Sequence, residues 1–408
     1  MVRSCILIGI VCVCLSAAGQ QLPTAPQPQQ TMQQDGPARP KRVGDQACVP
    51  CHEAYGTSYR RTSHHLTSQL ANGNSILGSF SGGGSNLKIL DPIASKSSPG
   101  LSFHMDRKDD GYYETAVVGL PGHEQSHSER IDVVTGSGTR GQSYLYWLGD
   151  QLFELPLSYW ADGHQWINSP GYKDETANFS RPIYPRCLEC HATAITPKSS
   201  DPLTNHYDRA SLVTGISCET CHGGGADHVT AHSETPAIAP ATASKTILNP
   251  ARFTRDRQVD LCALCHSGGK RVELAPAFSY LPGRELDGYL QPAQVDPATQ
   301  PDVHGNQVGL LQRSRCYLSS PTMSCSTCHD VHAPERPAAA YSDRCLSCHR
   351  VQSCKMSQTI GPKIADNCID CHMPKQPTNA IIVKTAGKVV RTTMRNHWIR
   401  IYPDVTQP

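Results

Sequence analysis

A pattern of two cysteines, separated by two residues and followed directly by a histidine, recurs seven times in this 408-residue chain. With 19 Cys and 19 His in the chain, chance alone gives roughly 0.04 such matches, so the repetition reflects a shared chemistry. The copies are Cys48, Cys51 and His52; Cys187, Cys190 and His191; Cys218, Cys221 and His222; Cys262, Cys265 and His266; Cys325, Cys328 and His329; Cys345, Cys348 and His349; and Cys368, Cys371 and His372.

The pattern is that of covalent haem attachment. Each cysteine adds through sulfur to one vinyl group of a porphyrin, and the histidine lies under the ring and binds the iron. Zinc sites also use C-x-x-C pairs, but they do not require a histidine directly after every second cysteine. A disulfide framework gives no reason for that histidine either. We therefore expect seven c-type haems, with the motif histidines as iron ligands.

Seven haem irons offer seven further axial positions, and twelve histidines outside the motifs are available for them. A histidine close to its own motif does not easily reach round the same ring, so we expect these residues to bind the iron of a neighbouring haem. The favoured ligands are His64, His65, His228, His304, His332 and His397. We expect ordinary solvated or hydrogen-bonded side chains at His104, His123, His127, His164 and His206. Ligation by two histidines favours lower reduction potentials than ligation by methionine and histidine.

The N-terminus has the features of an export signal. Arg3 precedes an apolar run over residues 5–15, and small residues follow, which predicts a signal peptide over 1–19. The alternative is an uncleaved anchor, but the run is shorter than the about 20 residues of a membrane span. We expect a periplasmic or cell-surface protein without a membrane span in the mature chain. Residues 20–44 are rich in Gln and Pro and are expected to be a disordered linker.

The first haem segment is expected at 45–71 and a β-rich insert at 72–180, where no motif occurs. Strand-like runs surround Asp110-Gly111 and Gly149-Asp150, two hairpin signals. The stretch GSGTRG (136–141) matches a dinucleotide-binding fingerprint, but a strand-like run follows it where that site requires a helix. We therefore expect a turn there.

Six motifs crowd into residues 187–372, so the expected six-haem domain at 181–380 has little chain with which to build an ordinary core. The porphyrins themselves must supply much of the buried apolar surface. The tail at 381–408 contains a strand-like run and His397. The predicted fold class is α+β with much irregular structure, with short helices around the haems and one β-rich insert. Cys316 and Cys354 lie outside the motifs, and a disulfide between them is the simplest expectation for an exported protein.

The motifs, the stretch CETCHGGGADH, the pair CSTCHDVH and the closing CIDCHMPK together resemble exported multihaem c-type cytochromes over roughly residues 45–400. The resemblance is to the class that includes the nitrifier tetrahaem cytochrome, hydroxylamine oxidoreductase and pentahaem nitrite reductase. Those reductases mark their catalytic haem with C-x-x-C-K, whereas every motif here ends in His. The resemblance to hydroxylamine oxidoreductase implies a tyrosine crosslinked to the catalytic haem, and the sequence singles out none of Tyr280, Tyr317 and Tyr341.

Three functions remain open at this point. The favoured one is electron transfer through seven haems in the cell envelope, with redox partner proteins or quinol-linked donors. The alternative is a haem-based oxidoreductase that acts on a small nitrogen or sulfur compound at one open-site haem. The third is a structural subunit of a larger haem assembly, and the oligomeric state is left open. A balance of 37 Lys and Arg against 35 Asp and Glu gives no basic surface for nucleic acid.

Overall fold

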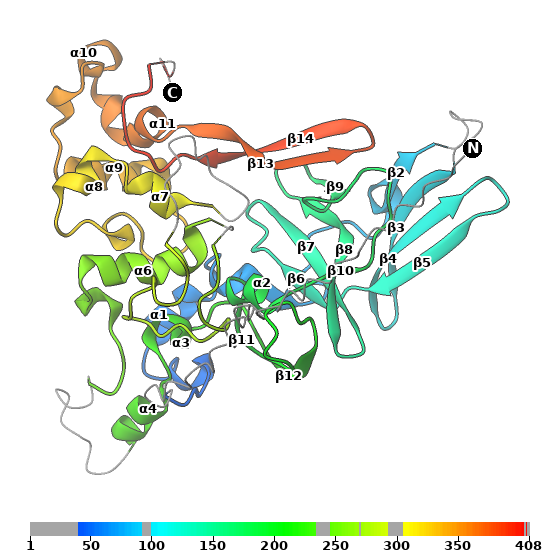
Figure 1. Ribbon diagram of the computed structural model, residues 1–408. Coiled ribbons are helices and arrows are strands. Elements are labelled where there is room, and N and C mark those ends of the chain that lie inside the picture. Colours follow the sequence, from blue (N-terminus) through cyan, green and yellow to red (C-terminus); the bar gives the residue numbers. More distant parts are fainter. Residues whose placement is uncertain are drawn as a thin grey trace, which may run out of the picture. The chain divides into compact units, whose positions relative to one another are not determined.

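The computed structural model describes residues 40–91, 99–233, 245–268, 271–292, 305–403 and 405, all within the unit Pro40–Pro408. The predicted signal peptide, the linker up to residue 39, and His304 lie outside these residues. The described part combines short helices with several antiparallel sheets (Figure 1), which confirms the predicted mixed α+β class.

Most of the β structure lies between the first and second motifs and forms two sheets. The larger sheet has the order β1-β6-β7-β8-β10 with β9 paired to β8, and the smaller has the order β2-β3-β4-β5. Their strands are β1 (Ser68–Leu70), β2 (Asn86–Leu90), β3 (Gly100–Lys108), β4 (Gly111–Gly119), β5 (Gln125–Arg130), β6 (Val133–Thr135), β7 (Gly141–Leu148), β8 (Gln151–Trp160), β9 (Gln165–Asn168) and β10 (Arg181–Pro182).

The expected turn between β7 and β8 is present, because Leu148 pairs with Gln151 and leaves Gly149-Asp150 as a two-residue turn. The other hairpin differs by one position. Lys108 pairs with Gly111, so the turn residues of β3 and β4 are Asp109 and Asp110. The carboxylate of Asp110 accepts a hydrogen bond from the Tyr113 hydroxyl at 2.6 Å, which favours the aspartate in the turn over the glycine.

The GSGTRG stretch joins β6 to β7, so strands lie on both sides of it and no helix begins there. Gly136 and Gly138 have φ angles of 94° and 84°, a region that residues with a side chain rarely adopt. The expected turn is therefore present.

The two sheets share one apolar core because side chains alternate between the faces of a strand. Phe103 and Met105 of β3 pack with Tyr144 of β7 and Leu157 of β8 in this core. The opposite face of the larger sheet, with Leu145 and Leu152, packs on Leu188 and Tyr207. Since Leu188 lies inside the second motif, the β structure directly supports that motif.

The remaining strands form two hairpins: β11 (Ala192–Pro197) with β12 (Tyr207–Thr214), and β13 (Lys375–Thr385) with β14 (Lys388–Arg395). The tip of the second hairpin, labelled β13 and β14 in Figure 1, is bound by Asp174, whose carboxylate accepts the N–H groups of Ala386 at 2.7 Å and Gly387 at 2.8 Å. Asn168 also donates to the carbonyl of Lys384 at 2.7 Å. These contacts attach the C-terminal segment to the β-rich part.

The helices of the described residues are short. The α-helices are α1 (Glu53–Tyr59), α2 (Pro185–Glu189), α3 (Cys218–His222), α4 (Ala226–Ser233), α6 (Arg255–His266), α7 (Gln307–Leu311), α8 (Arg315–Ser319), α9 (Ala338–Leu346), α10 (Ser357–Ile360) and α11 (Cys368–His372). The 3₁₀ turns are η1 (Asp45–Ala47), η2 (His65–Thr67), η3 (Gly82–Ser85), η4 (Pro250–Arg252), η5 (Cys325–Thr327), η6 (Val351–Ser353) and η7 (Pro362–Asp366).

Candidate haem sites

The motifs lie in helical turns, and this places their three reactive side chains together. Residues i, i+3 and i+4 share one face of a helix, so both cysteines and the histidine of a motif project to the same side. The third and seventh motifs are α3 and α11 themselves, and the fourth ends α6. In the first motif, a hydrogen bond of 3.0 Å from the His52 N–H to the Cys48 carbonyl closes the same turn.

The structure brings four motif histidines opposite four other histidines. The ring centroids are separated by 6.0 to 6.4 Å in every pair. The pairs are His52 with His228 (6.4 Å), His222 with His332 (6.1 Å), His329 with His397 (6.2 Å) and His266 with His64 (6.0 Å). The ring planes are within 28° of parallel in the first three pairs and 78° apart in the last.

These separations fit a metal ion held between two imidazoles. A metal–nitrogen bond is about 2.0 Å long, and the ring centre lies about 1.1 Å behind the nitrogen, so two ligands across one iron have centroids about 6.2 Å apart. Direct stacking of two imidazoles without an atom between them requires a much shorter separation. The residues present therefore fit iron with two axial histidines at four motifs.

Hydrogen bonds at Nδ1 orient several of these rings. When one ring nitrogen is held by an oxygen of the protein, the other nitrogen is left to face the metal. The Nδ1 contacts are His222 to the Leu248 carbonyl (2.8 Å), His372 to the Arg400 carbonyl (2.9 Å), His397 to the Arg395 carbonyl (3.2 Å), His191 to the Thr67 hydroxyl (3.1 Å) and His228 to the Thr246 hydroxyl (3.3 Å).

Burial keeps the ligand imidazoles in the form that binds a metal. Burial, followed by the neighbouring His266 and His329, lowers the pKa of His64 to about 4. Burial, with His329 as the next cause, also lowers the pKa of His397 to about 4. Neutral imidazole is the ligand form, so both side chains are ready for iron at neutral pH.

Cysteines of different motifs lie beside one another in the described residues. The neighbouring thiols are Cys48 with Cys218, Cys190 with Cys265, Cys262 with Cys325, and Cys345 with Cys368. Burial raises the pKa of Cys221 to about 11. These contacts place the first motif beside the third, the fourth beside the second and fifth, and the sixth beside the seventh.

Two carboxylates join the first motif to the third. Glu219, which is only 4% exposed, accepts the N–H groups of Val43, Gly44 and Gly225, each at 2.9 Å. In the opposite direction, Asp45 accepts the N–H of Cys218 at 2.9 Å. Neither residue was predicted from the sequence, although an acidic residue between the two cysteines of a motif is a visible signal.

The glycine run after the third motif permits this close approach. Gly223 has a φ angle of 75°, and a side chain at Gly224 would place its Cβ 2.1 Å from the Pro40 carbonyl oxygen. The chain can therefore pass against residues 40–44 and continue into α4, which presents His228 to His52.

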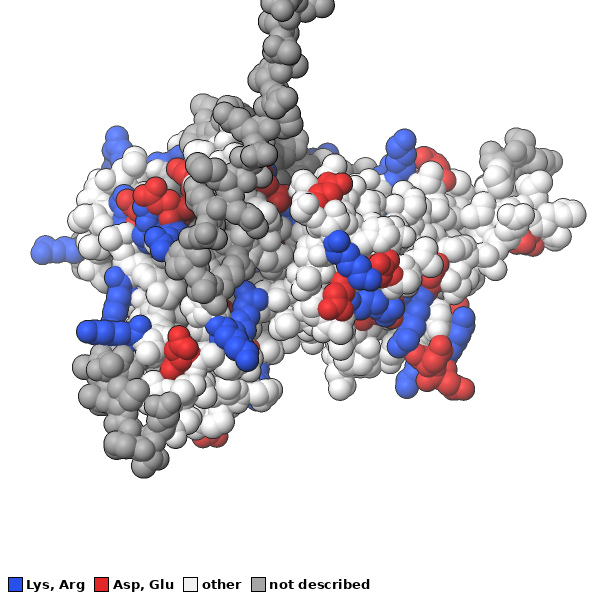
Figure 2. Space-filling view, turned by 60° about the horizontal axis from the view of Figure 1, so that its bottom comes forward, with Lys and Arg blue, Asp and Glu red and all other residues white. Residues whose placement is uncertain are grey.

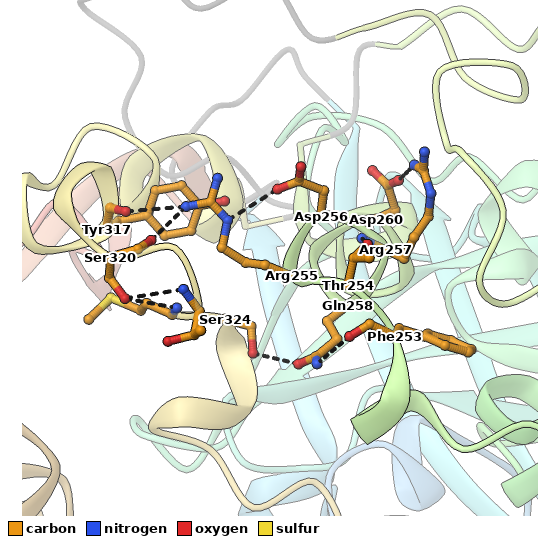
Figure 3. Close-up of polar contacts among 12 residues, drawn as sticks. Phe253, Thr254, Arg255, Asp256, Arg257, Gln258, Asp260, Tyr317, Ser320 and Ser324 are labelled. Carbon is orange, nitrogen blue, oxygen red and sulfur yellow. Dashed lines mark hydrogen bonds and ion pairs between the residues drawn. The ribbon is translucent and has the colours of Figure 1, made fainter.

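Polar contacts also join the fourth motif to the fifth (Figure 3). Arg255, at the start of α6, donates to the carbonyls of Tyr317 at 3.4 Å and Ser320 at 2.8 Å. Gln258 accepts a hydrogen bond of 2.7 Å from Ser324, the residue directly before the fifth motif. The helix that carries His266 is thereby fixed relative to the turn that carries His329.

The other histidines have different surroundings. His65 lies with Nδ1 3.9 Å from an Asp45 oxygen and its ring 5.9 Å from that of Tyr59. In the β-rich part, His206 pairs with Asp150 at 2.9 Å, His127 with Glu129 at 3.0 Å, and His104 contacts Asn86. His232, for which the sequence predicted no role, lies 4.6 Å from His228.

The expected disulfide is not formed. Cys316 and Cys354 are both free thiols in the structure. Cys316 lies near Cys328 of the fifth motif and Cys345 of the sixth, whereas Cys354 lies near Cys371 of the seventh. The two sulfurs are therefore associated with different haem sites, which sequence separation alone does not reveal.

Comparison with known proteins agrees with this chemistry. Residues 168–223, which include the second and third motifs, match the family described as cytochrome c554 and c-prime. The C-type polyheme cytochrome OmcC of Geobacter sulfurreducens is 24% identical over 176 residues, which cover 37% of this chain and 20% of OmcC. The chain therefore spans about a fifth of the length of that relative.

The crystal structure of the outer cell wall cytochrome OcwA shares the fold. It aligns with a TM-score of 0.56 at 17% sequence identity, covering 88% of this chain and 79% of OcwA. The motifs and these comparisons define the chain as a multihaem c-type cytochrome. Within it, the similarity to the cytochrome c554 and c-prime family is confined to residues 168–223. Among the residues described, no helix is long and apolar enough to cross a membrane.

Proposed function

We propose that this chain transfers electrons through seven covalently attached haems, one at each C-x-x-C-H motif. Haem iron supplies a one-electron ferric/ferrous couple when it is bound. The single observation that carries the proposal is the set of four facing imidazole pairs, with centroids 6.0 to 6.4 Å apart. An iron held on both sides by imidazole has no vacant position for a substrate, and this favours electron transfer over catalysis at those haems.

The structure supports a specific set of axial ligands for these four haems. The motif histidines and their partners are His52 with His228, His222 with His332, His266 with His64, and His329 with His397. The remaining motif ligands are His191, His349 and His372. We assign His65 and His304 as further axial ligands for these remaining haems.

We place this function outside the cytoplasm, in the periplasm or at the cell surface. OcwA, with which the chain shares its fold, is an outer cell wall cytochrome, and this supports the assignment. The partners are redox proteins or quinol-linked donors. On the face shown in Figure 2, basic and acidic side chains lie interspersed. A redox partner that binds this face therefore does not need a surface that is uniformly positive or uniformly negative.

Mass and spectroscopy of the mature protein test the proposal together. Intact mass, with a haem assay, should give seven haems per chain. Electron paramagnetic resonance of the oxidised protein should show low-spin ferric iron for at least four of them. A colourless chain, or high-spin iron at most haems, would overturn the proposal.

The second candidate is a reductase or oxidase of a small nitrogen or sulfur compound at one haem. The sixth motif favours it, because Cys348 and His349 are both exposed and, unlike His52 of the first motif, His349 has no second imidazole opposite it among the described residues. Carbon monoxide binding to the reduced protein separates the two functions. Rapid binding at one haem supports the oxidoreductase, and no binding supports electron transfer alone.

A further inference from the structure

The segment 395–402, which begins at the last residue of β14 and is called the strap below, contacts two haem motifs at once. It carries His397, whose ring faces that of His329 in the fifth motif at 6.2 Å. Three residues later, the carbonyl of Arg400 accepts a hydrogen bond of 2.9 Å from Nδ1 of His372 in the seventh motif. One short segment therefore contacts the axial side chains of two different haem sites.

Two guanidinium groups pack against the ring of Trp398 in the middle of the strap. The guanidinium of Arg313 lies 3.7 Å from the ring centre of Trp398, and that of Arg400 lies 4.0 Å from it. The indole N–H of Trp398 also donates to the Arg313 carbonyl at 3.2 Å. The Tyr402 hydroxyl donates to the Trp398 carbonyl at 2.8 Å, which closes the strap on itself.

A buried hydroxyl fixes the strap on both sides of Trp398. Ser314 is fully buried, and its oxygen accepts the Ile399 N–H at 2.8 Å and donates to the His397 carbonyl at 3.3 Å. Arg395 anchors the start of the strap through the carbonyls of Ile369 at 3.0 Å and Met373 at 2.8 Å, next to the seventh motif. The strap is thus attached beside both of the sites that it contacts.

We propose that the strap positions His397, which lies opposite His329 of the fifth motif, and His372 of the seventh motif as one unit, with Trp398 as the positioning residue. This inference rests on the proposed function, since it assumes haems at both motifs. A histidine whose Nδ1–H donates to a carbonyl is a stronger electron donor to the metal. The Arg400 carbonyl therefore holds the reduction potential of the haem at His372 low, while the same strap keeps His397 on the haem at His329.

The proposal predicts that weakening the contacts of Arg313 and Arg400 with Trp398 changes the properties of two haems together. A cation–π contact of this kind shifts an equilibrium about 2- to 30-fold. We expect Arg313→Gln to raise the rate of carbon monoxide binding at one haem of the reduced protein by about the same factor, because His397 leaves the iron more often. The same variant should raise the midpoint potential of one other haem.

The experiment compares Arg313→Gln and Trp398→Leu with Trp147→Leu, a matched control. Trp147 is also a half-buried tryptophan beneath an arginine, with Arg209 5.1 Å from its ring centre, but it lies in β7 away from the strap. Haem content, carbon monoxide kinetics and a redox titration are measured on each full-length protein. If Trp398→Leu does not accumulate, Arg313→Gln, which leaves the ring in place, carries the test.

The proposal is supported if a strap variant with unchanged haem content binds carbon monoxide faster at one haem and has a higher midpoint potential at another. Wild-type kinetics and potentials in both strap variants would overturn it. A change in only one of the two readouts would also overturn it, because the strap would then hold only one histidine. A wild-type protein without haem would overturn the proposed function as well, and the haem assay on the same sample distinguishes these failures.

Discussion

The imidazole of His228 lies 6.4 Å from that of His52, with the two ring planes only 20° apart. These residues come from different motif segments, since His52 ends the first motif and His228 follows the third in α4. The separation leaves room for one iron between the rings. The helix that follows the third motif therefore supplies the proposed second ligand of the first haem site.

Replacing His228 with alanine should open one haem without removing it. The thioether bonds and His52 remain, so the haem count should stay at the wild-type value while one iron loses its second axial ligand. Electron paramagnetic resonance should then show the high-spin signal of one haem. His206→Ala is the control, because that histidine pairs with Asp150 at 2.9 Å in the β-rich part. An unchanged low-spin spectrum in the His228 variant would remove this ligand assignment.

Glu219 should be important for stability because its buried carboxylate accepts three backbone N–H groups at 2.9 Å. An amide has only one acceptor oxygen and no charge. Hydrogen bonds to a charged group contribute about 1.5–3 kcal/mol each, so Glu219→Gln should lower the free energy of unfolding by about that amount for one lost bond. Denaturant unfolding monitors the change. Glu53→Gln, at an exposed position in α1, serves as control. Equal stability of the two variants would contradict this role for Glu219.

The class of multihaem c-type cytochrome was readable from the sequence because each C-x-x-C-H motif is local. Cysteines and a histidine within five residues need only one helical turn to act together. The turn at Gly149-Asp150 was also readable, since turn preferences act over a few residues. The Asp110-Gly111 turn was displaced by one position because the strand register, with Lys108 opposite Gly111, decides which residues turn.

Contacts between residues that are far apart in the sequence could not be predicted in the same way. His64 was an expected ligand, but only the folded chain shows that its ring lies 6.0 Å from that of His266. The expected disulfide failed for the same reason, because Cys316 and Cys354 lie by different motifs. Glu219 went unnoticed because its role depends on residues 43 and 44, which approach it only in the folded chain.

The buried Glu114 should make the β-rich part less stable as the pH rises. One of its oxygens accepts the Leu157 N–H at 3.1 Å, and the other has no hydrogen-bond partner among the described residues. Burial, with only partial compensation by that bond, raises the pKa of Glu114 well above its ordinary value. The contribution of the protonated Glu114 side chain to the free energy of unfolding is therefore fully present below the unfolded-state pKa of about 4.3. It is lost as the pH rises through the raised pKa of the folded state.

Glu114→Gln removes this ionisation while keeping the shape of the side chain. Relative to wild type, we expect the variant to gain stability with rising pH, by about 1–3 kcal/mol near neutrality. Thermal unfolding at pH 4 to 8 measures the difference. Glu124→Gln, at an exposed position, should show no such trend. A pH-independent difference between wild type and Glu114→Gln would show that ionisation of this carboxyl is not the cause.

Two thiols should be titratable in the mature protein because Cys316 and Cys354 are both free. The fourteen motif cysteines are consumed by thioether bonds in the proposed haem protein, so a thiol reagent added to the denatured, unreduced chain should report two groups. The variants Cys316→Ser and Cys354→Ser should each report one, with wild-type haem content. A disulfide gives a different pattern: no thiol in the wild type, and one newly exposed thiol in each variant. That result would contradict the structure, in which Cys316 and Cys354 both carry free thiols.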